Sequence, residues 1–114
     1  MQMTATEVGN ALVVVVEDRR IDAAVAVRFK DNMLEIAAKP NQRVVLDLSK
    51  MEFMDSSGLG AVVGSMKQLG RDRQLDLAGL TPTVDKVFRI TRMDRVFRIY
   101  DTAEAALQDI AHAT

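Results

Sequence analysis

The stretch VVLDLSKMEFMDSSGLG occupies residues 44–60. Its first five residues form a nearly continuous apolar run, which is typical of a strand covered on both faces and predicts a place at the centre of a sheet. Farther along, apolar residues recur at intervals of three and four and predict a helix that Gly70 ends; they are Leu59, Val62, Val63, Met66 and Leu69. In open parallel sheets, binding sites lie on loops that lead from a strand into a helix. We therefore expect the functional residues between Lys50 and Gly60.

Strand and helix patterns alternate on both sides of this stretch. Besides residues 44–48, the predicted strands lie at residues 4–8, 12–16, 75–78 and 97–100. The predicted helices run over residues 22–38, where Lys39-Pro40-Asn41 supplies the stop, from Ser57 to Gly70, from Thr81 to Thr91 and from Thr102 to Ile110. Thr81 is expected to cap its helix, because Pro82 follows at the first helical position. This order predicts an α/β sandwich with a mixed, largely parallel sheet of four to five strands and about four helices.

Composition narrows the class of protein. The chain has 114 residues, of which 48% are hydrophobic and 27% charged, so we expect one globular domain over residues 1–114. It has no cysteine, no apolar run long enough to span a membrane, and a formal charge of −1. We therefore expect a cytoplasmic protein without membrane insertion, without direct nucleic-acid binding, and with neither a metal nor a cofactor.

The residues around the serine pair carry a family resemblance. Val44–Leu48 followed by Phe53–Gly60 resembles the signature of STAS-domain anti-anti-sigma factors, and the predicted order of elements follows the same family. The resemblance implies a STAS-like sandwich and a regulator that is not an enzyme. In that family the serine directly after the aspartate is phosphorylated, which corresponds to Ser56 here, with Ser57 as the second choice.

The resemblance also implies the partners. They are an anti-sigma factor serine kinase with a histidine-kinase-like ATPase fold, which the unphosphorylated protein captures to free a sigma factor, and a PP2C-type phosphatase that reverses the phosphorylation. The family has an aspartate beside the switch serine, and Asp22 matches it. A glycine that is usual just before this aspartate is replaced here by Arg19 or Arg20.

Physical reasoning adds expected roles for the loop. A helix N-terminus can hold a phosphoserine dianion, whereas a bound partner next to the added charge is repelled. Gly58 and Gly60 are expected to let a kinase approach the backbone, and Phe53, Met54 and Leu59 to supply apolar contact area. The complete set of expected partner-binding residues is Asp22, Phe53, Met54, Asp55, Ser57, Gly58, Leu59 and Gly60.

Other functions remain as alternatives. The closest one is a STAS subunit of a lipid-transporting ABC complex, which would dock on a permease without phosphorylation. A nucleotide-binding or hydrolysing enzyme is disfavoured, because the chain has no Gly-Lys-Ser/Thr phosphate loop and no Gly-x-Ser-x-Gly elbow, and its only histidine is His112 near the C-terminus.

Simpler structural interpretations apply to several residues. A serine pair that opens a helix often serves only as a cap, and of the two we expect Ser57 to cap. Gly60 and Gly64 are expected to allow close packing of a helix on the sheet. The basic residues Lys86, Arg89, Arg92, Arg95 and Arg98 recur every third position, but a helix end and a strand start separate them. A solvated surface is therefore expected, with a protein contact as the alternative.

Overall fold

A computed structural model describes residues 2–40 and 43–112 of the chain. Its main sheet has five strands in the order β1-β2-β4-β6-β7, of which β1 and β2 are antiparallel and the others parallel. These strands are β1 (Met3–Val8), β2 (Ala11–Val16), β4 (Arg43–Asp47), β6 (Gln74–Ala78) and β7 (Ile99–Tyr100). A second, two-stranded sheet joins β3 (Arg20–Ile21) to β5 (Phe53–Met54) in parallel.

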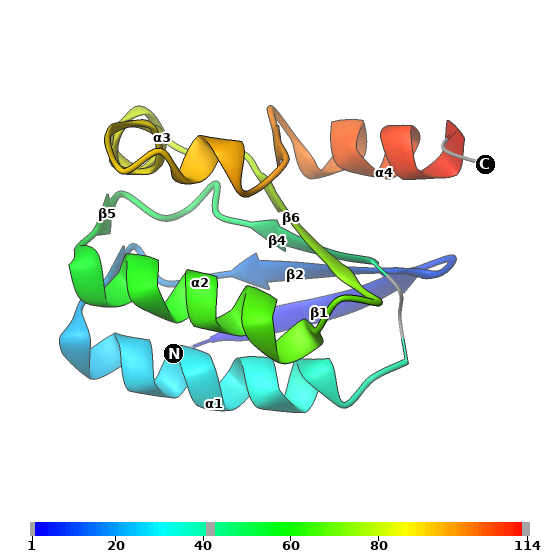
Figure 1. The fold of residues 1–114 in the computed structure, drawn as a ribbon, viewed down its shortest axis with the longest axis horizontal. Helices are drawn as coiled ribbons and strands as arrows, with labels where there is room; N and C mark the ends of the chain where they lie inside the picture. Colours follow the sequence, from blue (N-terminus) through cyan, green and yellow to red (C-terminus); the bar gives the residue numbers. More distant parts are fainter. Residues whose placement is uncertain (1, 41–42, 113–114) are drawn as a thin grey trace.

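Helices cover both faces of the main sheet (Figure 1). They are α1 (Ala23–Ala37), α2 (Ser56–Leu69), α3 (Pro82–Ile90) and α4 (Ala103–His112), with a short 3-10 helix η1 (Met93–Arg95). In Figure 1 the helices α1 and α2 lie side by side below the sheet and α4 lies above it. Helix α3 lies beside β5, and its Val84 and Phe88 pack in the same apolar cluster as α1 and α2. The predicted α/β sandwich with four helices and a mixed, largely parallel sheet is confirmed.

The core shows why β4 is central. Val44, Leu46 and Leu48 pack in the large apolar cluster shared with α1 and α2, whereas Val45 packs on the other face with Ala106 of α4. All four of these side chains are at most 1% exposed. Each buried aliphatic side chain contributes about 1.5–3 kcal/mol, so a continuous apolar run is stable only where both faces are covered.

The ends of three elements can be compared with the predicted ends, and β7 is the one that starts later than predicted. Thr81 stands at the N-cap position of α3, but its hydroxyl donates to the Met51 carbonyl at 2.7 Å and caps nothing in the helix. Phe97 precedes β7 and packs edge-on against Phe88 of α3, with ring centroids 6.0 Å apart, because the chain joins β6 only from Arg98 onward. Helix α1 ends at Ala37, just before the predicted stop signal Lys39-Pro40-Asn41. Asn41 of this signal lies outside the described residues.

Thr102 opens the last helix as predicted. Its hydroxyl accepts a hydrogen bond from the Ala105 N–H at 3.0 Å, and its carbonyl accepts one from the Ala106 N–H at 3.2 Å. The Ala106 side chain below this turn is fully buried against Val45 and Ala78. The cap therefore fixes the point at which α4 starts to cover the sheet.

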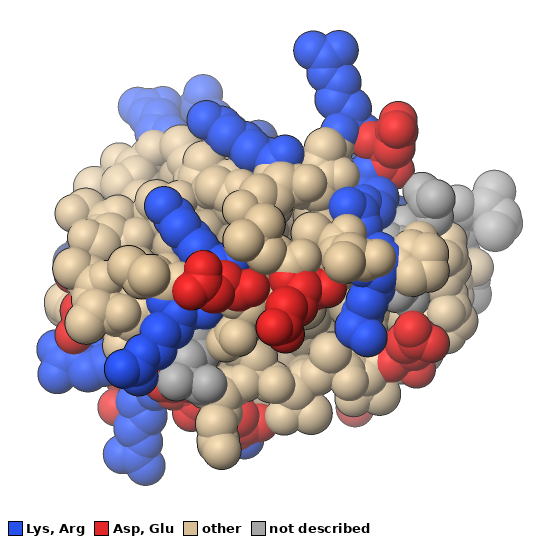
Figure 2. Space-filling view, turned by 90° about the horizontal axis from the view of Figure 1, so that it is seen from below, with Lys and Arg blue, Asp and Glu red and all other residues tan. Residues whose placement is uncertain are grey.

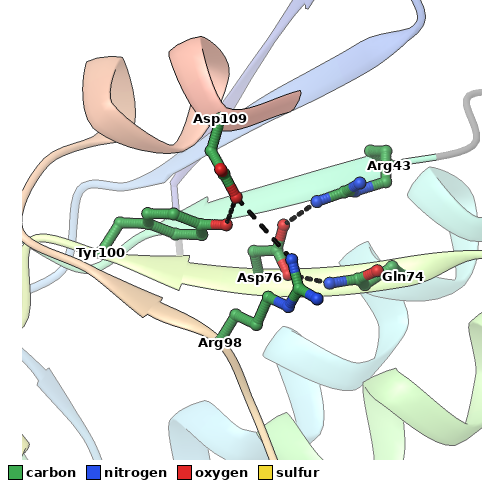
Figure 3. Close-up of polar contacts among 6 residues, drawn as sticks. All are labelled: Arg43, Gln74, Asp76, Arg98, Tyr100 and Asp109. Atoms are coloured by element: carbon green, nitrogen blue, oxygen red, sulfur yellow. Dashed lines mark hydrogen bonds and ion pairs between the residues drawn. The ribbon is translucent and has the colours of Figure 1, made fainter. Parts of the chain in front are cut away.

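A buried carboxylate lies on the α4 side of the sheet, in β6 (Figure 3). Asp76 is 0% exposed and accepts hydrogen bonds from Arg43 Nη2 at 2.9 Å and Gln74 Nε2 at 2.7 Å. Burial of an unpaired carboxylate is costly, so these two donors are what make an acid tolerable inside this strand.

The surface charge is mixed on the α1 side. Figure 2 views the molecule from below, where α1 lies, and shows acidic and basic side chains interspersed among neutral ones. This distribution agrees with the formal charge of −1 for the whole sequence. Recognition on this side has to come from local chemistry.

Candidate partner-binding site

Two helices begin side by side at the small sheet. In the register of β3 and β5, Ile21 pairs with Met54, and each is followed directly by an aspartate. Asp22 caps α1 by accepting from the Val25 N–H at 3.1 Å, and Asp55 caps α2 by accepting from the Gly58 N–H at 3.0 Å. Parallel pairing thus brings together the capping aspartates and the positive ends of two helix dipoles.

The serine pair lies just inside α2. Ser56 is the first residue of the helix and Ser57 the second, and both are exposed. The prediction that Ser57 caps the helix is wrong, because Asp55 has the extended backbone of an N-cap and its carboxylate takes the free amide of Gly58. The helix therefore starts one residue earlier than predicted, and neither serine is needed as its cap.

The expected contact residues divide between surface and core. Phe53 is 42% exposed, Gly60 is exposed and Leu59 is half-buried, so these three present surface next to the serines. Met54 is only 3% exposed and belongs to the main apolar cluster. The expected contribution of Met54 to partner contact area is therefore corrected: this side chain anchors the loop from inside.

The glycines of α2 have different roles from those predicted. A Cβ added at Gly58 would lie 2.5 Å from Ile21 Cγ2 and 2.9 Å from the Ile21 carbonyl oxygen, whereas one added at Gly60 would meet nothing within 4 Å. At Gly64 the nearest atom would be Lys30 Cε at 3.9 Å. The prediction of close packing at Gly60 and Gly64 is wrong, and the buried Gly58, which we expected at the kinase contact, is the position where α2 presses against β3.

An arginine stands where the family resemblance leads one to expect a glycine. The Arg20 guanidinium lies over the Phe53 ring, with Cζ 5.2 Å from the ring centroid. The neighbouring Arg19 carbonyl accepts from the N–H groups of Glu52 and Phe53, at 2.6 and 3.1 Å. Such a cation over an exposed ring contributes about 0.5–1 kcal/mol and holds the ring in place beside the serine loop.

A shallow groove of about 370 Å³ separates the first turns of α1 and α2. It is lined by Ala23, Ala26, Val27, Lys30, Ser57 and Gly60. Val27 is 62% exposed, an unusual position for a valine. We did not predict these α1 residues as part of the site, although Val27 falls off the buried helical face of Ala26 and Phe29 and could have been noticed for that reason.

Comparison with known proteins identifies the family. The family model described as STAS domain matches residues 2–106. The chain belongs to the STAS family. The resemblance read from the residues around the serine pair is confirmed at the level of the family.

Several proteins similar to this STAS domain are named as anti-sigma factor antagonists. An anti-sigma-B factor antagonist of Listeria monocytogenes is 34% identical over 80 residues, which are 69% of this chain and 70% of that protein. The crystal structure of an anti-sigma factor antagonist from Mycobacterium paratuberculosis superposes with a TM-score of 0.87 at 24% identity, covering 96% of this chain and 93% of the other. The structure of the anti-sigma factor antagonist SpoIIAA in its unphosphorylated form superposes with a TM-score of 0.77 at 22% identity, covering 99% of this chain and 98% of the other. The structure of Bacillus SpoIIAA in its phosphorylated form superposes with a TM-score of 0.71 at 20% identity, covering 96% of this chain and 99% of the other.

Among residues 2–40 and 43–112 of this STAS domain, no three histidine, aspartate or glutamate side chains gather as ligands for a metal ion. In the same part of the chain, none of the helices combines the length and the apolar character needed to cross a bilayer.

The Asp55 cap gives a direct stability prediction. Asp55→Ala should lower the free energy of unfolding by about 1 kcal/mol, because the Gly58 N–H loses its acceptor, whereas Asp55→Asn should retain most of the stability since an amide oxygen also caps. Urea titration followed by circular dichroism measures both values. Asp31→Ala, at an exposed site within α1, is the control and should change stability by less than about 0.5 kcal/mol. Equal losses for the Ala and Asn variants of Asp55 would contradict the capping role.

Proposed function

We propose that this STAS domain is a cytoplasmic anti-sigma factor antagonist that works as a phosphorylation switch. Its unphosphorylated form binds an anti-sigma factor serine kinase with a histidine-kinase-like ATPase fold and thereby frees a sigma factor. Phosphorylation of Ser56 ends that binding, and a PP2C-type phosphatase restores it. The observation that carries the proposal is the position of Ser56, which is exposed at the first residue of α2, directly after the capping Asp55.

The surroundings of Ser56 suit both states of such a switch. In the isolated domain, a phosphate on Ser56 would lie at the positive end of α2 and in water, so the fold tolerates it. In a complex, the same phosphate would add a charge of about −1.5 to −2 near Asp55 and near Asp22, which follows the neighbouring strand β3. Little water would remain between the domain and its partner to hydrate this charge. Repulsion and lost hydration would then expel the partner without any unfolding.

The surface around Ser56 offers contacts to a partner in the unphosphorylated state. The exposed ring of Phe53, held under Arg20, stands on one side, and the groove with Val27 and Gly60 lies on the other. Aromatic and aliphatic side chains surrounded by polar ones are typical of the energetic centre of a protein interface. That SpoIIAA has been solved both with and without phosphate supports the same cycle here.

The test is to locate the phosphate. After incubation of the purified protein with its anti-sigma factor kinase and ATP, peptide mass spectrometry should find one phosphate, on Ser56. Ser56→Ala should abolish incorporation, and Ser57→Ala, the matched control at the neighbouring exposed position, should retain it. Phosphate on Ser57, or none on either serine, would overturn the assignment. Recovery of the unmodified protein with a lipid-transporter permease would favour the transporter-subunit alternative.

A further inference from the structure

A second open groove lies at the far end of α2 from Ser56. It has a volume of about 1070 Å³ and is bounded by residues 66–71 at the end of α2, the edge of β6, and residues 94–100, which lead into β7. Strand β7 pairs only with Leu77 and Ala78, so no described strand lies beside the first half of β6 on this edge. The edge of the sheet is therefore formed by β7 along the second half of β6 and by β6 itself along its first half. The groove lies beside this first half of β6.

Leu75 of β6 lines this groove beyond the start of β7, with 4% of its surface exposed. The Leu77 N–H donates to the Arg98 carbonyl at 2.9 Å and the Gly79 N–H to the Tyr100 carbonyl at 3.0 Å. Backbone groups of alternate residues point to the same side of a strand, so the N–H and C=O of Leu75 face the β7 side, where β7 has not yet begun. An unpaired strand edge of this kind is a template for an additional strand.

The groove is strongly cationic. Five basic residues line it against two acidic ones: Lys67, Arg71, Arg73, Arg95 and Arg98 face Asp94 and Asp109. Of the five, only Arg98 takes part in an ion pair within the described part of the chain, at 3.7 Å from Asp109. The other four have no carboxylate partner among the described residues, but Arg73 donates to the Leu69 and Lys39 carbonyls at 3.2 and 2.8 Å. Lys67, Arg71 and Arg95 are therefore the cations that a ligand can meet.

The acidic residues of the groove are already engaged. Asp94 pairs with Arg89 at 3.9 Å. Asp109 accepts the Tyr100 hydroxyl and lies beside Arg98, as Figure 3 shows. Burial, and then this hydrogen bond to Asp109, raise the pKa of Tyr100, so the phenol stays a neutral donor. A negative ligand would therefore meet little repulsion from these carboxylates.

We propose that this edge groove binds an extended acidic segment of a partner protein, which adds a strand beside β6 and pairs with the backbone of Leu75. Lys67 and Arg71 come from the α2 side of the sheet. Acidic side chains at alternate positions of the added strand share one face, and with that face toward α2 they meet these two cations. Val96, 48% exposed, and Ile99 offer contact to apolar residues in between. Strand addition supplies affinity through the backbone, and charge supplies selectivity.

This site is separate from the switch. Helix α2 has 14 residues, which span about 20 Å. Ser56 is its first residue, and the groove lies at its last turn. The domain can therefore hold an acidic segment whether or not Ser56 is modified.

The test uses a fluorescein-labelled peptide of alternating glutamate and valine and the full-length protein, with fluorescence anisotropy as the readout. The double variant Lys67→Glu/Arg71→Glu should bind at least about tenfold more weakly. Lys86→Glu reverses one charge, against two in the double variant, at an exposed α3 position outside the groove, and it should bind like wild type, as should Ser56→Asp. Circular dichroism verifies that each variant is folded. Equal binding by the double variant and Lys86→Glu would overturn the proposal, and loss of binding in Ser56→Asp would place the peptide at the switch instead.

Backbone pairing has its own test. Peptide binding should slow hydrogen exchange of the Leu75 amide, and a peptide N-methylated at alternate residues should bind at least about tenfold more weakly because it cannot pair along a strand. If the N-methylated peptide binds equally, or if inorganic phosphate displaces the parent peptide at the same concentration, the groove is a simple anion site and the strand-addition proposal is wrong.

Discussion

Ser56→Asp should weaken binding to the anti-sigma factor kinase by at least about 1 kcal/mol, whereas Ser56→Ala should bind like the wild type. The Ala variant is harmless because Asp55, rather than either serine, caps α2. The Asp variant adds one negative charge beside two capping aspartates, and a buried interface cannot hydrate it. Phosphoserine carries more charge, so the phosphorylated protein should lose several kcal/mol. Isothermal titration with the purified kinase measures all four forms.

Stability is the control for this experiment. A negative group in the first turn of α2 interacts favourably with the helix dipole, so Ser56→Asp should leave the free energy of unfolding unchanged or raise it by about 0.3–1 kcal/mol at low salt. Weaker binding by a fully folded Ser56→Asp variant then reports on the interface. Equal affinities for the Ala, Asp and phosphorylated forms would rule out electrostatic release, and a melted Asp variant would replace the rigid switch with a folding switch.

Gly58→Ala and Gly60→Ala should have opposite effects on stability. The new methyl at Gly58 would stand 2.5 Å from Ile21 Cγ2 and 2.9 Å from its carbonyl oxygen, and a backbone atom cannot move aside cheaply, so the domain should lose about 1–3 kcal/mol. At Gly60 the methyl meets nothing within 4 Å, and alanine is favoured over glycine within a helix by up to about 1 kcal/mol.

The pair is well matched, because both changes add one methyl group to the first turns of the same helix. Chemical denaturation of the two variants and the wild type gives the comparison directly. If Gly58→Ala is as stable as Gly60→Ala, the contact between α2 and β3 is looser than the described geometry, and the tight junction at Ile21 is refuted.

The main layers could be predicted from sequence because each rests on a repeating pattern. Apolar residues at a spacing of three and four located α1 and α2, and the continuous run of Val44 to Leu48 located the central strand. The small sheet was not predicted, since β3 and β5 have two residues each and such short strands show no periodicity. It is nevertheless the element that positions the site.

Within the candidate site, residue type predicted exposure poorly. Phe53 and Met54 look equivalent in sequence, yet one is 42% and the other 3% exposed, because alternate residues of β5 point to opposite sides. Glycine gives no sign of whether its missing side chain faces a neighbour, so Gly58 and Gly60 could be distinguished only in three dimensions. The cationic edge groove was also missed, since its members come from segments far apart in the chain.

The pairing of β3 with β5 makes the starts of α1 and α2 a single unit of local unfolding. Besides the ladder itself, the Asp55 N–H donates to the Ile21 carbonyl at 3.3 Å, so fraying of the first turn of α2 also removes a partner from the residue before Asp22. Gly58 adds a contact of α2 with the same Ile21. Opening of either helix start therefore breaks contacts of the other, and hydrogen exchange should show the two starts opening together.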